Sequence, residues 1–135
     1  MHVPCTGSYR PSPETLERFI ARVEQNAYAE AIEEFYTANA SMQENQAAPR
    51  LGRDNLVNGE RKVLERAKSL TSTCVRPIFV SGDKVVIRWI FRFEWLDGSQ
   101  TQMEERAFQR GEGERIAEDT FFHDPAQQLP RTANT

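Results

Sequence analysis

The chain has 135 residues, enough for one domain with a substantial hydrophobic core and too few for two comfortable ones. Its composition, 39% hydrophobic and 27% charged, is ordinary for a globular protein, and its net charge of −3 argues against nucleic acid as a partner, because phosphate binding needs a concentrated basic surface. No apolar stretch approaches the roughly 20 residues that cross a bilayer, so we expect no membrane partner. The N-terminus lacks the features of a signal peptide, and Cys5 and Cys74 are the only cysteines, which favours a reduced, cytoplasmic protein.

Two amphipathic helices are predicted near the N-terminus. Residues 1–11 contain prolines and a glycine without periodicity, so we expect a flexible arm. A helix begins where Ser12 offers a capping hydroxyl and Pro13 occupies the first helical position. Its buried stripe has helical spacing and consists of Leu16, Phe19, Ile20 and Val23. A second helix is predicted from a second stripe, made of Tyr28, Ile32, Phe35 and Tyr36.

The middle of the chain is predicted to contain a third helix. Residues 40–45 suit a brief strand, and residues 46–52, which include Pro49, suit a loop. Residues 53–68 then have the apolar spacing of a helix, which Gly59 weakens locally. These elements complete the helical part of the chain.

A long strand gives the strongest signal in the sequence. Residues 85–95 alternate strictly, with one fully apolar face made of Val85, Ile87, Trp89, Phe91, Phe93 and Trp95. Turn signals and further strands follow, at residues 100–110 and 115–122. A strand at residues 71–80 precedes it, and Pro77 predicts that this strand lies at an edge or carries a bulge, because proline cannot donate to a ladder.

This order predicts an α+β fold, with three N-terminal helices packed on one face of a strongly curved, mostly antiparallel sheet. The long apolar face needs a cover, and the helices are the elements that can supply it. The predicted domain spans residues 12–125, and the polar residues 126–135 are expected to form a frayed tail.

Several short segments resemble the NTF2-like superfamily and, within it, the SnoaL-like proteins related to polyketide cyclases and ketosteroid isomerases. The matching segments are residues 35–40 (FYTANA), 52–54 (GRD), 105–108 (ERAF), 113–116 (GERI) and 121–125 (FFHDP). The resemblance covers about residues 12–125. It implies a cone-shaped cup that is open at one end, and a homodimer formed through the sheet.

The resemblance also implies a function. Such proteins hold a small hydrophobic molecule in the cup, and some are cofactor-independent isomerases, cyclases or dehydratases that work by carboxylate proton transfer. The alternative is a non-catalytic ligand-binding or protein-interaction module, because the fold carries both kinds of function. No cofactor is expected in either case.

Three carboxyl groups are candidates for this chemistry. The resemblance places Glu44 where the isomerases carry their general base, although an exposed glutamate beside Asn45 is the alternative. Glu105 falls near the position of a protonated acid, but both faces of its strand are mixed, and an ion pair with Arg88 or Arg92 is equally compatible. Asp119 lies on the last strand, where a solvent-facing carboxylate is the expected orientation.

One departure from the isomerase pattern argues against steroid isomerisation. The stretch that should carry a tyrosine, residues 18–21, reads RFIA and offers no hydroxyl.

The isolated histidines His2 and His123 predict no metal site. The residues expected to line the ligand pocket are Phe19, Tyr36, Asn39, Met42, Trp89, Phe91 and Phe122.

Overall fold

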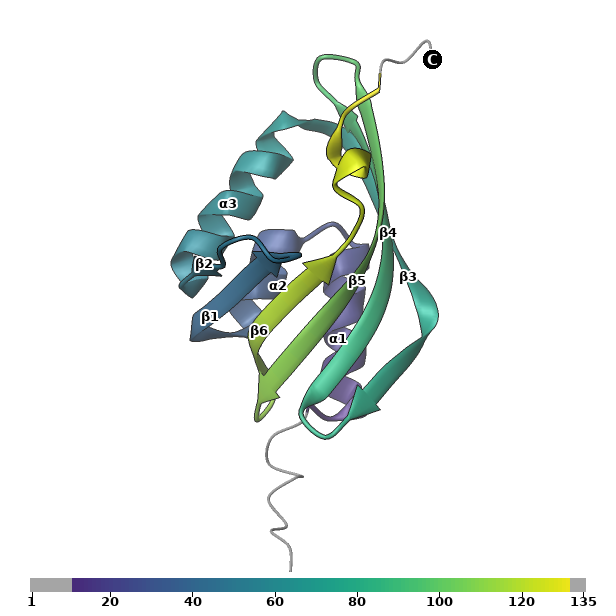
Figure 1. Ribbon diagram of the computed structural model, residues 1–135. Coiled ribbons are helices and arrows are strands. Elements are labelled where there is room, and N and C mark those ends of the chain that lie inside the picture. Colours follow the sequence, from purple (N-terminus) through teal and green to yellow (C-terminus); the bar gives the residue numbers. More distant parts are fainter. Residues whose placement is uncertain (1–10, 132–135) are drawn as a thin grey trace, which may run out of the picture.

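The computed structural model describes residues 11–131, which form three helices on one side of a curved six-stranded sheet (Figure 1). The strand order is β2-β1-β6-β5-β4-β3, and every neighbouring pair is antiparallel except the parallel pair β1–β6. This confirms the predicted α+β architecture. The expected arm, residues 1–11, lies outside the described residues except for Pro11.

The first two helices begin and end as local chemistry dictates. Helix α1 (Pro13–Glu24) starts at Ser12, whose hydroxyl accepts a hydrogen bond of 3.1 Å from the Thr15 backbone N–H. Its predicted stripe is buried against the sheet. Helix α2 (Tyr28–Phe35) buries its own stripe, and the chain then passes directly into β1 (Tyr36–Glu44).

Strand β1 is longer than the sequence predicts. The expected strand began at residue 40, whereas β1 begins at Tyr36, and β2 (Arg50–Leu51) occupies part of the expected loop. The reason is long-range pairing, because β6 runs parallel to β1 on one side and β2 pairs with it on the other. Neither contact has a signature in the local sequence.

Helix α3 (Arg53–Arg66) is followed at once by β3 (Ala67–Ser81), so this strand starts four residues before the predicted position. Pairing with β4 (Lys84–Trp95) extends to Ala67, which lies opposite Trp95. β3 is an edge strand, and its register shifts between Val75 and Phe79. Pro77 therefore marks both an edge and an irregularity, as predicted.

The long strand β4 carries the core. Its apolar face points toward the helices, and Val85, Ile87 and Trp89 are each at most 2% exposed. β5 (Gln100–Glu112) pairs with β4 along nearly its full length, and β6 (Arg115–Phe122) follows. The predicted alternation is confirmed.

Within the described residues 126–131, the C-terminal segment differs from the expected frayed tail, and residues 132–135 of that prediction lie outside the described part of the chain. Residues Pro125–Gln128 form a 3-10 helix, and the Gln127 side chain accepts a hydrogen bond of 2.7 Å from the Glu104 backbone N–H. Arg131 exchanges two backbone hydrogen bonds of 2.6 Å with Gln100. The polar composition of the segment does not predict this ordered structure, because the contacts are made by backbone groups and one side-chain amide.

Among residues 11–131, no helix combines the length and the apolar character that crossing a membrane requires.

Candidate functional site

A cavity of about 340 Å³ lies between the helices and the inner face of the sheet. Its size falls within the range of small-molecule pockets, about 300–1,000 Å³. Most of the lining is apolar: Phe19, Val23, Tyr28, Ala31, Ile32, Met42, Val63, Trp89, Phe91, Phe93, Met103 and Phe121. Polar groups enter it from five elements and from the C-terminal segment: Tyr36, Glu44, Arg50, Glu60, Glu105, Gln109, Asp119 and Gln128.

The structure brings together eight of the ten residues predicted for the site. All three carboxyl candidates line the cavity, with Phe19, Tyr36, Met42, Trp89 and Phe91. Asn39 and Phe122 do not line it. Asn39 is exposed together with Ala38, in the part of β1 where the register with β6 shifts between Tyr36 and Ser41. Strand alternation turns Phe122 outward, and it is 43% exposed while Phe121 lines the cavity.

Glu105 faces the cavity from β5. The inward face of this strand is the one that carries Thr101, Glu105 and Gln109, all buried. The cross-strand ion pair belongs to its neighbour instead, since Glu104 lies 2.7 Å from the Arg88 guanidinium. Burial, together with the nearby carboxyl groups of Glu44, Asp119 and Glu60, raises the pKa of Glu105 to about 8. At pH 7 most molecules therefore carry Glu105 as an uncharged acid.

Asp119 is almost fully buried, at 1% exposure, so the expected solvent-facing orientation is wrong. The solvent-facing acid of β6 is Glu118, which pairs with Arg110. The Tyr36 hydroxyl donates to Asp119 Oδ2 at 2.5 Å, and the Gln109 amide donates to the same oxygen at 3.2 Å. Burial raises the pKa of Asp119 to about 7 despite these two donors. Oδ1 has no hydrogen-bond partner among the described residues.

Replacing Tyr36 with phenylalanine should raise the pKa of Asp119 from about 7 by roughly one to two units. The hydroxyl donates to the carboxyl group and favours its charged form, so its removal favours the proton. A carbon-detected NMR titration of the Asp119 carboxyl group measures the change. Tyr28→Phe is the matched control, because the Tyr28 hydroxyl pairs with Ser72. An unchanged Asp119 titration in Tyr36→Phe would contradict this role for the hydroxyl.

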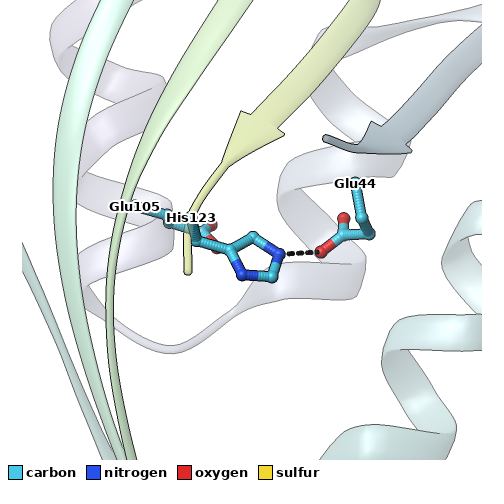
Figure 2. Close-up of side chains that lie close together, drawn as sticks. All are labelled: Glu44, Glu105 and His123. Atoms are coloured by element: carbon cyan, nitrogen blue, oxygen red, sulfur yellow. Dashed lines mark hydrogen bonds and ion pairs between the residues drawn. The ribbon is translucent and has the colours of Figure 1, made fainter. Parts of the chain in front are cut away.

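Glu44 ends strand β1 and is half-buried, rather than exposed on a loop. It lies 3.3 Å from His123 Nε2, just beyond β6 (Figure 2). It also lies 3.2 Å from the Arg50 guanidinium of β2. The parallel pairing of β1 and β6 aligns Glu44 with Phe121 and so brings His123 beside it. Arg50 and His123 are thus the polar partners of the Glu44 carboxyl group.

His123 is a residue whose role the sequence did not indicate. Its ring is buried beside Glu44, and Nδ1 has no partner among residues 11–131. One donor atom each of His123, Glu44 and Glu105 lies within 4.8 Å of the others. Zinc ligands at about 2.0–2.2 Å from the metal lie only about 3.4 Å apart in a tetrahedron. Of these three side chains, His123 and Glu44 are joined by a hydrogen bond of 3.3 Å, and the absence of a metal site stays a prediction.

Four further polar groups line the cavity without having been predicted from the sequence: Arg50, Glu60, Gln109 and Gln128. Glu60 follows Leu56 at helical spacing on α3, so the buried stripe itself could have indicated it. Burial raises the pKa of Glu60, and Arg50 partly opposes this shift. Gln109 lies on the same face of β5 as Glu105, so it could have been predicted once the inward face of this strand was known. No sequence pattern indicates Arg50, because its position in the cavity depends on the pairing of β2 with β1.

The missing helix α1 tyrosine is replaced by hydroxyls from other elements. Tyr28 opens α2 and Tyr36 opens β1, and both line the cavity. Helix α1 therefore lacks the tyrosine of the isomerase pattern, but two other tyrosines still line the cavity.

Solved structures share this fold at low sequence identity. A hypothetical protein with a ketosteroid isomerase-like fold from Catenulispora acidiphila, in complex with trimethylamine, has a TM-score of 0.71 and 15% identity over 86% of this chain and 89% of its own. An NTF2-like protein of unknown function from Burkholderia pseudomallei has a TM-score of 0.72 and 12% identity over 85% and 92%. An LEH-like epoxide hydrolase from M. tuberculosis has a TM-score of 0.69 and 11% identity over 84% and 83%.

These likenesses establish the fold, which proteins of differing function share. No curated protein matches the chain in sequence. The model of the SnoaL-like domain matches residues 16–128, which include the helices, the sheet and every polar residue of the cavity. The chain therefore belongs to the SnoaL-like domain family and has the NTF2-like fold.

Proposed function

We propose that the protein binds a small hydrophobic molecule in its cavity and catalyses proton transfer on it without a cofactor, as an isomerase, cyclase or dehydratase. One observation carries the proposal: the uncharged acid Glu105 and the ion-paired carboxylate Glu44 have oxygens within 4.8 Å of each other at an apolar cavity. A carboxyl group that keeps its proton at pH 7 can act as the acid, and a second carboxyl group beside it can act as the base.

The proposed reaction uses a carbonyl substrate. Glu44 removes a proton from the carbon beside the carbonyl, and the electrons of that C–H bond form the carbon–carbon double bond of an enolate. The Glu105 O–H donates a hydrogen bond to the enolate oxygen, where negative charge develops. Return of the proton from Glu44 to a different carbon gives the isomer and restores both side chains.

Asp119 and Tyr36 support the acid. The nearby Asp119 carboxyl group contributes to the raised pKa of Glu105, and Tyr36 fixes the position of Asp119 by its hydrogen bond. Asp119 is therefore proposed as the second partner acid. The mostly apolar lining makes the surroundings of these groups less polar than water, which strengthens their electrostatic interactions.

A simple probe tests the reaction. The wild-type protein should accelerate the conversion of cyclohex-3-enone to its conjugated isomer, or the exchange of α-hydrogens for deuterium in a panel of cyclic ketones, relative to heat-denatured protein. Absorbance and proton NMR follow the two reactions. Ketones that bind in the cavity without any acceleration would favour the alternative, a non-catalytic binding module.

A homodimer through the outer face of the sheet is proposed as well. Phe108 and Phe122 are 42% and 43% exposed on adjacent strands of this face, which supports an apolar contact. The mass in solution, measured by sedimentation equilibrium, tests it, and a monomer at all concentrations would exclude it.

A further inference from the structure

We propose that the cavity also binds an apolar amine that carries its positive charge into the pocket. The inference goes beyond the proposed function, because this amine is a ligand of the same cavity and not the substrate of the proton transfer, which needs the Glu105 proton. It stands on the balance of charge, the unsatisfied oxygens and the aromatic lining.

The charged groups of the cavity are unbalanced. Four carboxyl groups face it, from β1, α3, β5 and β6: Glu44, Glu60, Glu105 and Asp119. Arg50 is the only guanidinium or ammonium group of the described chain that lines it, and Arg50 already pairs with Glu44. No Lys or Arg of the described chain forms an ion pair with the other three carboxyl groups. A cation supplied by the ligand would fill this deficit.

Two of these carboxyl groups keep hydrogen-bonding capacity. Asp119 is 1% exposed, and its Oδ1 is buried without a partner, whereas Oδ2 accepts from Tyr36 and Gln109. No hydrogen bond joins the Glu105 carboxyl group to another residue within the described range. An unpaired buried oxygen costs stability, so a donor at this place would be favourable. A protonated amine offers donors and charge together.

The apolar lining suits a cation as well. Trp89 and Phe91 stack with ring centroids 5.5 Å apart, and Tyr28 meets Phe91 edge-on at 5.8 Å. Aromatic faces attract ammonium groups, with tryptophan the strongest. Arg18 and Arg66 stack on Phe35 and Trp95, two rings outside the cavity lining, so these cations leave the rings of the cavity available.

The protonation state of Glu105 affects how tightly a cation binds. With a pKa of about 8, Glu105 is protonated about ten times more often than it is ionised at pH 7, so a cation that pairs with the ionised form loses about tenfold in affinity. An adjacent positive charge typically lowers such a pKa by one to three units, which offsets the penalty. Binding of an amine should therefore release a proton from the cavity, whereas a neutral molecule should not.

A matched pair of probes tests the inference. Cyclohexylmethylammonium and cyclohexylmethanol have the same shape and both donate hydrogen bonds, so they differ chiefly in charge. Isothermal titration calorimetry on the wild-type protein should show the ammonium binding at least tenfold more tightly at pH 8. Comparison of two buffers with different ionisation enthalpies should show proton release at pH 7 for the ammonium alone. Its affinity should rise from pH 6 to pH 8, while that of the alcohol stays constant.

Variants locate the effect. Glu105→Gln should reduce the preference for the ammonium severalfold, and Glu104→Gln, whose side chain lies on the other face of β5, should leave it unchanged. Equal or tighter binding of the alcohol, or no binding of either probe, would overturn the amine assignment. Isomerisation of the neutral enone is measured separately, so its success with failure of the amine preference would leave the proposed reaction intact.

Discussion

Replacing Glu105 with glutamine should increase the free energy of unfolding by about 5 kcal/mol at pH 9 and change it little at pH 4. The pKa of Glu105 is about 8 in the folded protein and 4.5 in an exposed chain, and each unit corresponds to about 1.4 kcal/mol. The folded wild type thus binds this proton more tightly than the unfolded chain. The contribution of Glu105 to stability is highest below pH 4.5, falls as pH rises through the interval up to about 8, and then levels off. The amide cannot ionise and avoids that loss.

Glu104→Gln is the matched control for stability. Glu104 neighbours Glu105 in sequence but faces outward, and its hydrogen bond with Arg88 lowers the pKa of its carboxyl group. Its contribution is present above the unfolded pKa and is lost on acidification, so this variant should be slightly less stable at neutral pH. Urea unfolding followed by tryptophan fluorescence at pH 4, 6 and 9 measures both variants. The absence of a gain for Glu105→Gln at pH 9 would contradict the assignment of Glu105 as a buried, uncharged acid.

Replacing Glu44 with glutamine should reduce the rate of enone isomerisation, or of deuterium exchange, by a factor of about 100 or more. A positioned general base typically contributes 10² to 10⁴ in rate, and an amide cannot accept the proton. The wild-type rate should also decline above about pH 8, because Glu105 then loses the proton that it donates in a hydrogen bond. Initial rates across pH 5–10 measure both effects.

Glu118→Gln is the control for catalysis. Glu118 is exposed on β6 and pairs with Arg110 outside the cavity, so its loss should leave the rate unchanged. Glu44→Gln with the wild-type rate would exclude Glu44 as the base. In that case Asp119, with one free oxygen, would become the next base to test.

The sequence predicts the framework of this protein better than its site. Strict alternation in β4 determines which face is buried, and the pairing of β5 follows from a turn signal. The same logic cannot orient Glu105 or Asp119, because each strand carries acids or other polar residues on both faces. Their inward direction depends on register with β4 and β6, which only the folded sheet defines.

Contacts distant in sequence account for the remaining differences. Glu44 and His123 are 79 residues apart and meet only because β1 and β6 run parallel. Arg50 lies in a two-residue strand, which is too short for a sequence pattern to predict. Local patterns report burial and helix boundaries well, whereas polar sites assembled from several strand ends depend on the topology of the whole sheet.

The shortness of β2 links local opening of the backbone to the electrostatics of the pocket. This strand is held to β1 by two residue pairs at the edge of the sheet, and both of its residues are exposed. Such edges detach at low free energy, long before the domain unfolds. Detachment of β2 would carry Arg50 away from Glu44 and remove the one Arg or Lys of the described chain that lines the cavity. Opening of two edge residues thereby sets how often an arriving molecule meets Glu44 without its arginine partner.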